Sequence, residues 1–276
     1  MNEDTDSSTV TVAVDDAVVR CLLTGVDREG VDPVVLLPGL GGSTETEFSF
    51  LRPLLARTAR VLAVDLQYAA PSPATLESAV GQLAAVMRQV LPGRNVTLVG
   101  FSVGATVAAA FAEASPEVGA LVLVAPVLQA TERHRMVAVL RSRLLTGDLN
   151  AVRDLDSFTA HSASFLQAHL PAPLAPQADS AGITAKHELF ASTDLADSVP
   201  RISAPTLVVG ATQDDLAGVD QARMVFASLP NARYTEIDSG HAVLAERPAE
   251  VLALIREFAA HPLRHPAGSV LEGARP

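Results

Sequence analysis

One short motif does most to constrain how this chain can fold: Gly100-Phe101-Ser102-Val103-Gly104, a Gly-x-Ser-x-Gly sequence. It follows the strand-like run 95–99 and precedes the alanine-rich run 103–114, which contains good helix formers. We therefore predict a tight turn from strand to helix, with Ser102 at its centre and its hydroxyl clear of the backbone. Strand and helix approach so closely at such a turn that the residues two before and two after must be small, and both are glycine. The helix that starts beneath Ser102 directs its amide dipoles towards the serine and favours a negative charge there.

Apolar strand-like runs alternate with helical segments over most of the chain. This alternation predicts an α/β fold, with a mostly parallel eight-stranded sheet and helices on both of its faces. The first two runs flank Asp15-Asp16 and predict an antiparallel hairpin, while a helix is expected over 47–56 with an irregularity at Pro53. The predicted strands are 9–14, 18–23, 34–37, 60–65, 95–99, 120–124, 206–209 and 234–237.

The alternation of strand-like and helical runs stops in the middle of the chain, which suggests that a separate segment is inserted there. Residues 128–195 contain helical patterns but no strand run, and we predict that they form a helical cap inserted into the fold. The core then comprises residues 9–127 and 196–260, with a disordered tail at 1–8 and a C-terminal tail at 261–276. The cap is expected over the C-terminal edge of the sheet, where open α/β sheets bind ligands.

Charge and cysteine content exclude several classes of function. The chain has 31 acidic against 20 basic residues, a net charge of −11, which disfavours nucleic acid and anionic membrane surfaces as partners. Cys21 is the only cysteine, so an intrachain disulfide is impossible. No apolar segment reaches about 20 residues and the first residues are acidic, so we expect no membrane span and a cytoplasmic protein, either monomer or homodimer.

Two further side chains complete a possible nucleophilic site around Ser102. A serine nucleophile needs a base to take its proton and a third group to orient that base. His241 follows the run 234–237, and Asp214 lies just past the run 206–209, so both follow strand ends. We predict Ser102, Asp214 and His241 as catalytic residues, with Asp215 and Asp238 left as alternative acids.

A glycine-rich loop, Pro38-Gly39-Leu40-Gly41-Gly42-Ser43, follows the buried run 34–37. Glycines let backbone amides come close to a ligand. Negative charge that develops during acyl transfer needs such donors already in place. We predict the backbone N–H groups of Leu40 and Val103 as the donors of an oxyanion hole.

Taken together, these motifs resemble the α/β-hydrolase family with a short helical cap, over about residues 9–260. The order serine, aspartate, histidine is typical of that family. Two positions depart from its pattern: Pro38-Gly39 stands where members usually have His-Gly, and Gln67-Tyr68-Ala69-Ala70-Pro71 replaces a glycine-rich turn. The matching pieces are Pro38-Gly39-Leu40-Gly41-Gly42, Gly100-Phe101-Ser102-Val103-Gly104, 205–214, Gly240-His241 and Glu246-Arg247-Pro248.

The resemblance implies a serine hydrolase that cleaves a carboxylic ester or lactone of a small, largely apolar substrate through an acyl-serine intermediate. Thioester hydrolysis, acyl transfer and carbon–carbon bond hydrolysis use the same residues and remain open, as does a ligand-sensing protein on this fold. No metal or nucleotide motif is visible, so no cofactor is expected.

The apolar side chains of the predicted cap supply candidates for substrate binding. We predict that the substrate meets Phe101 beside the serine and a roof formed by cap residues. The arginines at 133, 135, 141 and 143 lie in the same segment. They could bind an acidic group of a substrate, but a solvated helix face is the favoured interpretation. The predicted roof residues are Met136, Leu140, Leu144 and Phe165.

Overall fold

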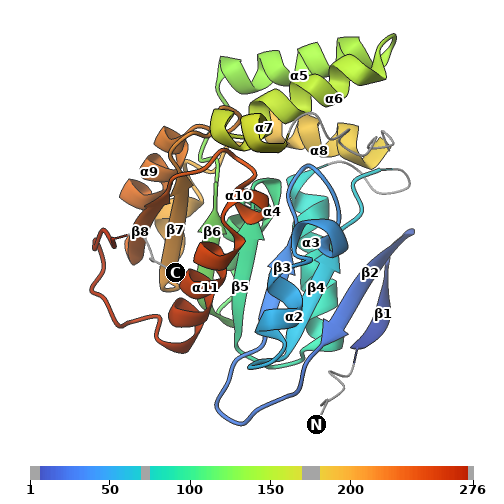
Figure 1. Cartoon of the computed structure of the whole chain (residues 1–276). Helices are drawn as coiled ribbons and strands as arrows, with labels where there is room; N and C mark the ends of the chain where they lie inside the picture. The colour runs from blue at the N-terminus through green and yellow to red at the C-terminus, as the bar shows by residue number, and fades with distance from the viewer. Residues whose placement is uncertain (1–6, 70–74, 170–180, 273–276) are drawn as a thin grey trace.

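The computed structural model describes residues 7–69, 75–169 and 181–272. In this part of the chain, eight strands form one sheet in the order β1-β2-β4-β3-β5-β6-β7-β8, as Figure 1 shows. Strands β1 and β2 pair antiparallel, β2 pairs antiparallel with β4, and all other neighbours are parallel. The predicted fold class is therefore confirmed. The strands are β1 Ser7–Val14, β2 Ala17–Thr24, β3 Val34–Leu37, β4 Val61–Asp65, β5 Val96–Phe101, β6 Val118–Val124, β7 Thr206–Ala211 and β8 Ala232–Ile237.

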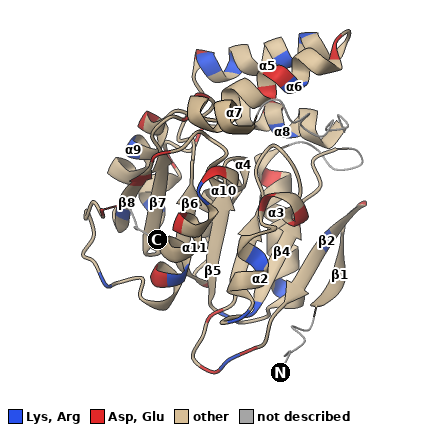
Figure 2. Ribbon diagram, in the orientation of Figure 1, with Lys and Arg blue, Asp and Glu red and all other residues tan. Residues whose placement is uncertain are grey.

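The central strands are apolar on both sides because each face of the sheet is covered by helices. In β3, Val35 and Leu37 join one buried cluster, while Val34 and Leu36 join a second cluster on the opposite face. Helices α3 (Leu76–Val90), α4 (Val103–Ala112) and α9 (Val219–Ser228) contribute to the first cluster. Helices α2 (Leu51–Leu55) and α11 (Pro248–Ala260) contribute to the second. Strands β3, β5 and β6 contain no charged residue, as expected for strands buried on both faces, and the ribbon of β5 is tan in Figure 2.

Four helices lie together above the C-terminal edge of the sheet (Figure 1), and we call them the cap helices. They are α5 (Glu132–Leu145), α6 (Leu149–Ala160), α7 (Ala163–His169) and α8 (Ala181–Ser192). Helix α8 also packs into the core, because its Leu189 and Phe190 belong to the same buried cluster as α4. The cap helices contact the loops that follow β3, β7 and β8, through Lys186 to Gly39, Arg133 to Asp215 and Phe190 to His241. Residues 170–180 of the predicted cap lie outside the described residues.

Local boundaries differ from the predictions at several places. Two short helices, α1 (Thr44–Glu47) and α2, replace the helix expected over 47–56, and Pro53 fits in the first turn of α2, where its missing N–H has no helical acceptor. Strand β1 begins at Ser7, so Ser7 and Ser8 are paired in the sheet, and residues 1–6 of the predicted tail lie outside the described part. The segment around Val270 forms a parallel bridge to Tyr234 of β8, so it is not a free tail.

The remaining elements are the 3₁₀ turn η1 (Val199–Arg201) and helix α10 (Val243–Glu246), which precedes α11. Within residues 7–69, 75–169 and 181–272, no helix combines the length and the apolar composition needed to cross a bilayer.

Candidate active site

Ser102 occupies the strained turn that the Gly-x-Ser-x-Gly motif predicts. It lies between the last residue of β5 and the first residue of α4, with φ 54° and ψ −120°, a conformation that non-glycine residues rarely adopt. Its N–H donates to Val124 O of β6 at 2.9 Å. A Cβ at Gly100 would come within 2.6 Å of Ala105 Cα, and one at Gly104 within 2.6 Å of Pro38 O. Both glycines are therefore required by close backbone contact.

His241 and Asp214 meet Ser102 at the C-terminal ends of the strands. His241 Nε2 lies 2.8 Å from Ser102 Oγ, and His241 Nδ1 lies 2.8 Å from Asp214 Oδ2. A carboxylate can only accept, so Nδ1 carries the proton and Nε2 is left to accept from the serine hydroxyl. The three residues are 1%, 4% and 9% exposed in the order Ser102, His241, Asp214. The structure therefore brings the three predicted residues into one buried hydrogen-bonded chain.

Asp214 is held in place by the loop that follows β7. Its Oδ1 accepts the backbone N–H groups of Leu216 at 2.9 Å and Ala217 at 2.8 Å. Burial alone would raise the pKa of Asp214, but the charge and hydrogen bond of His241, together with backbone N–H donors, hold this pKa below its ordinary value. Asp214 is thus a carboxylate that faces His241.

The two alternative acids point elsewhere. The Asp215 side chain is 58% exposed and pairs with Arg133 at 3.1 Å. Asp238 accepts from Thr212 Oγ1 at 3.1 Å and from Gln213 Nε2 at 2.6 Å. Neither acid is hydrogen-bonded to His241, so the geometry selects Asp214 among the three.

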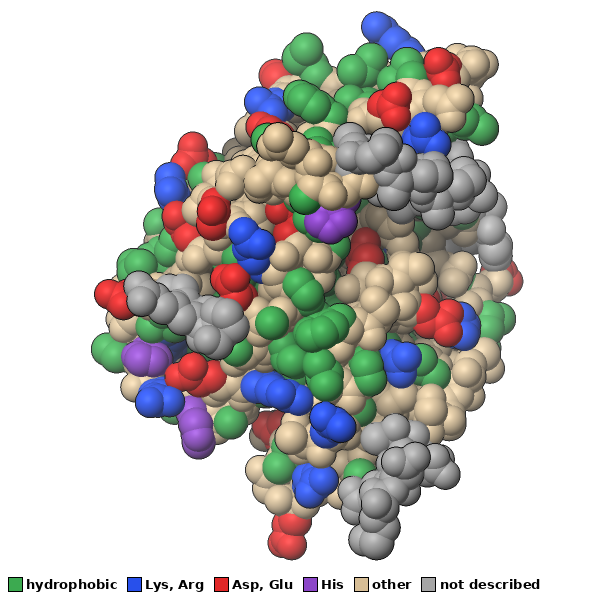
Figure 3. Space-filling view, viewed as in Figure 1, with side chains coloured by type: hydrophobic (Ala, Val, Ile, Leu, Met, Phe, Trp, Pro, Cys, Tyr) green, Lys and Arg blue, Asp and Glu red, His purple; other side chains and the backbone are tan. Residues whose placement is uncertain are grey.

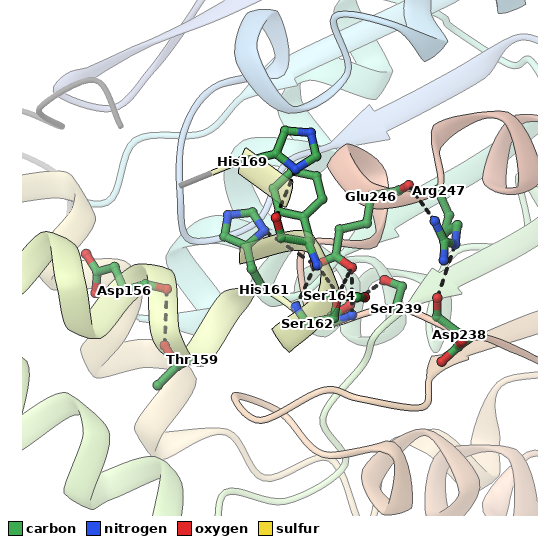
Figure 4. Close-up of polar contacts among 12 residues, drawn as sticks. Asp156, Thr159, His161, Ser162, Ser164, His169, Asp238, Ser239, Glu246 and Arg247 are labelled. Atoms are coloured by element: carbon green, nitrogen blue, oxygen red, sulfur yellow. Dashed lines mark hydrogen bonds and ion pairs between the residues drawn. The ribbon is translucent and has the colours of Figure 1, made fainter. Parts of the chain in front are cut away.

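Glu246 joins the loop of His241 to the cap helices (Figure 4). Its Oε1 accepts the N–H of Ser162 at 2.8 Å, and its Oε2 accepts the Ser162 hydroxyl at 2.6 Å and the N–H of Gly240 at 3.2 Å. The backbone adds a further bond, from Ala242 N to Ala160 O at 2.7 Å. The position of His241 therefore depends on contacts with the α6–α7 junction. Sequence reasoning placed Glu246 in a matching motif but gave it no role.

The loop of residues 38–43, which we call the oxyanion loop, lies directly against the serine. A Cβ at Gly39 would lie 2.9 Å from Ser102 Cβ. Leu40 and Val103, the two predicted donors, are both buried. The N–H of Val103 is the first of α4 and has no acceptor within the helix. Leu40 lies between Gly39 and Gly41, outside any helix or strand.

Sequence reasoning missed two charged residues behind the oxyanion loop. Glu47 of α1 accepts the N–H of Gly39 through Oε2 at 2.5 Å. Lys186 of α8 donates from Nζ to Gly39 O at 3.0 Å and to Gly42 O at 2.7 Å. The only sequence feature that could have drawn attention to Lys186 is that it is the only lysine of the chain. No motif connects it with Gly39 and Gly42, which lie 147 and 144 positions earlier in the sequence.

The predicted roof of the pocket needs correction. Met136 is 70% exposed and Leu140 is 46% exposed, so both lie on the outer face of α5. Their spacing showed that they share a face, but His134 and Arg141 occupy the covered one. Figure 3 shows hydrophobic side chains at this outer face, over α5 and α6.

The other predicted contact residues lie deeper. Leu144 is half-buried, and Phe165 stacks between His161 and His169, with ring centroids 4.7 Å and 3.9 Å away. Phe101 packs 5.4 Å from the His241 ring. Phe190 of α8, which was not predicted, makes a T-shaped contact with that ring, with ring centroids 6.5 Å apart.

The arginines of α5 do not form one solvated face. Arg133 and Arg135 are exposed and pair with Asp215 and Glu132. The Arg141 side chain is only 3% exposed and pairs with Asp156 of α6 at 3.1 Å, so it joins two cap helices. Within the described residues, no group of three or more His, Cys, Asp or Glu side chains is arranged to hold a metal ion.

Comparison with known proteins gives relatives at two levels of similarity. Pyrrolizixenacetamide deacetylase of Xenorhabdus hominickii is 29% identical over 240 residues, which cover 82% of this chain and 90% of that protein. An alpha/beta hydrolase enzyme from a Medee basin deep-sea metagenome library superposes with a TM-score of 0.80 at 20% identity, covering 90% of this chain and 96% of the other. The enol-lactonase of Burkholderia xenovorans superposes with a TM-score of 0.79 at 23% identity, covering 90% and 99%.

The two solved structures share the fold of this chain. A family model described as "Alpha/beta hydrolase family" matches residues 34–254, which include the oxyanion loop, Ser102, Asp214 and His241. This range spans most of the 276 residues. The chain therefore belongs to the alpha/beta hydrolase family.

Proposed function

We propose that this chain is a serine hydrolase that cleaves a carboxylic ester or lactone of a small, largely apolar substrate through an acyl-serine intermediate. One observation carries the proposal: Ser102 Oγ lies 2.8 Å from His241 Nε2, whose other ring nitrogen lies 2.8 Å from a buried carboxylate. This arrangement lets the imidazole take the serine proton while the neighbouring carboxylate stabilises the imidazolium that forms.

The reaction proceeds in two steps. Ser102 Oγ attacks the acyl carbon, His241 takes its proton and then gives it to the leaving oxygen, and an acyl-serine forms. A water then gives its proton to His241 and attacks the acyl carbon. The bond from that carbon to Ser102 Oγ breaks, His241 returns the proton to Oγ, and the acid is released. The N–H groups of Leu40 and Val103 stabilise the oxyanion in both steps.

The apolar surroundings of His241 support a largely apolar substrate. Phe101 and Phe190 flank the imidazole ring. A site lined by aromatic side chains with few polar groups suits a small apolar acyl or alcohol portion.

A second candidate is the hydrolysis of an N-acetyl amide. The observation that favours it is the 29% identity to a protein named a deacetylase of an acetamide. The same residues serve both reactions, because the imidazolium of His241 can protonate a leaving nitrogen as well as a leaving oxygen.

The test measures turnover of aryl esters of rising acyl length, several lactones and an aryl acetamide by the wild-type protein. Ser102→Ala should lower kcat by about 10³-fold or more, and the exposed Ser49→Ala should leave it unchanged. Faster hydrolysis of the acetamide than of the matched acetate would favour the second candidate. Absence of turnover on every compound would contradict both.

A further inference from the structure

We propose that Lys186, on the cap helix α8, is a positioning residue that orients the Leu40 N–H of the oxyanion hole. The inference rests on the proposed function, because it assigns a role in stabilising the oxyanion of that reaction. The residue does not touch the substrate in this proposal. It acts through the peptide group that joins Gly39 to Leu40.

The geometry of that peptide group carries the argument. The carbonyl of Gly39 and the N–H of Leu40 belong to one planar trans peptide, so they point in opposite directions. Lys186 Nζ donates to Gly39 O at 3.0 Å. A bond that holds the carbonyl on one side therefore also sets the direction of the N–H on the other. An ammonium donor polarises the amide as well, which strengthens the N–H as a donor.

The neighbouring peptide groups are held at the same time. Lys186 also donates to Gly42 O at 2.7 Å, while Glu47 accepts the N–H of Gly39 at 2.5 Å. Glu47 takes a further backbone hydrogen bond from Gly41. The oxyanion loop contains three glycines, whose backbones have wide conformational freedom, so these contacts restrict a segment that would otherwise adopt many conformations. Pro38 has neither an N–H nor a polar side chain, so it cannot donate a hydrogen bond that would orient the loop.

Burial makes the pair of charges costly, which argues against a passive role. Lys186 is 8% exposed, and burial lowers the pKa of its ammonium, while the nearby Glu47 and Asp65 oppose that shift. Burial raises the pKa of Glu47, and Lys186 opposes that shift in turn. Buried charges of this kind are weak sources of stability. A function in the oxyanion loop explains why an ammonium is placed here.

Glu47 is itself positioned by the core. Helix α1, which carries it, begins at Thr44, whose N–H and hydroxyl both donate to Asp65 of β4 at 2.7 Å and 3.1 Å. The Lys186 ammonium lies 5.5 Å from the ring centroid of Tyr68, which follows the same strand. The oxyanion loop is therefore held between the core on one side and the cap on the other.

The test compares K186M, E47Q and the K186M/E47Q double variant with the wild-type protein. On the best ester substrate, K186M should lower kcat about 10- to 100-fold, with KM changed less than threefold, because an oxyanion donor acts in the transition state and not in substrate binding. The affinity for a trifluoromethyl ketone, which forms an oxyanion with the serine, should fall by a similar factor. The buried Leu189→Ala on the same helix is the control for lost packing, and it should lower Tm without lowering kcat at temperatures where it is folded.

The double variant separates positioning from charge balance. K186M leaves the Glu47 carboxylate buried without its cation, and the double variant removes both charges, so it should recover Tm. It should not recover kcat, since Gly39 O still lacks its donor. A double variant with wild-type kcat would overturn the proposal, because Lys186 would then only neutralise Glu47.

Two further outcomes distinguish this inference from the proposed function. If K186M matches the wild-type protein in kcat and inhibitor affinity, the proposed role of Lys186 is contradicted. The proposed serine hydrolase function is not affected by that result. If a fluorophosphonate fails to label the wild-type Ser102, the proposed function is wrong and this inference falls with it.

If K186M does not fold, K186R is tested instead, because it retains the cation. We expect K186R to have a kcat reduced at least fivefold at unchanged KM, because a guanidinium cannot place one nitrogen between both carbonyls. K186R with wild-type kcat would overturn the proposal.

Discussion

At the scale of single residues, Asp214 and Asp215 are adjacent in the sequence but have different surroundings. Asp214 is buried and faces His241, while Asp215 is exposed and pairs with Arg133. We expect Asp214→Asn to lower kcat by up to about 10⁴-fold, because an amide at this position favours the wrong tautomer of His241. The matched Asp215→Asn should change kcat less than threefold. Steady-state kinetics on one ester decides between them, and a reversed order would exclude Asp214 as the orienting acid.

Glu246 offers a second residue-scale prediction. Its side chain is only 2% exposed, and Glu246→Ala would leave the N–H groups of Ser162 and Gly240 without their acceptor. Each unsatisfied buried donor costs about 1–3 kcal/mol, so the loss of both partners should lower Tm by roughly 3–10 °C. We also expect kcat to fall about tenfold, since Gly240 precedes His241. Thermal unfolding and kinetics measure both effects.

The control for Glu246 is Glu250→Ala, at a half-exposed position in the next helix. It should alter Tm by less than 2 °C and leave kcat unchanged. If Glu246→Ala behaves like this control, the junction between α6 and α7 does not position the loop of His241.

How far the site could be predicted depended on the sequence separation of its contacts. Ser102 was identified by its own flanking residues, and Asp214 and His241 by their places after strands. Lys186 and Glu47 had no such local pattern, because each acts on a backbone atom of a loop elsewhere in the chain. A hydrogen bond to a carbonyl requires no particular residue type at that carbonyl, so it leaves no motif.

At the scale of elements, the cap helices contain buried histidines that make them sensitive to acid. Burial lowers the pKa of His134 in α5 and of His161 after α6, and it lowers the pKa of His187 in α8 to about 3. The unfolded chain binds these protons near pH 6.5, before the folded protein does. The stability that these neutral histidines contribute is therefore complete above pH 6.5 and is lost as the pH falls below it, for His187 over the range from 6.5 towards 3.

His187→Leu tests this expectation. For each histidine that stays neutral in the folded protein, the free energy of unfolding falls by up to about 1.4 kcal/mol for every pH unit below 6.5. Between pH 7.5 and pH 5.0, the variant should therefore lose less free energy of unfolding than the wild-type protein, by about 2 kcal/mol in urea titrations. The exposed His261→Gln is the control and should lose as much as the wild-type protein. An equal loss in the His187 variant would contradict the assignment.

The faces of the cap helices could not be predicted from spacing. In α5, Met136 and Leu140 share a face, but the covered face contains His134, whose Nε2 lies 3.0 Å from Ala217 O, and Arg141. Polar side chains are buried there because they find partners across the helix boundary, which a hydrophobicity pattern does not register.

At the scale of the whole molecule, the parallel sheet was predictable because its strands are apolar on both faces. The strand order was not, since β4 lies between β2 and β3 through pairings that join residues 20–24 and 34–36 with residues 61–65. The edge contact of Val270 with β8 was also missed, because a single bridge in a proline-containing segment lacks the period of a strand.

The central claim is that Ser102 is the nucleophile of this molecule, and covalent labelling tests it most directly. The protein is treated with a fluorophosphonate, and intact mass and peptide mapping locate the adduct. We expect one phosphonyl group per chain, on Ser102, with ester turnover lost in proportion to labelling and no adduct in Ser102→Ala. Ester turnover by a wild-type protein whose Ser102 stays unlabelled, or by Ser102→Ala at the wild-type rate, would contradict the account.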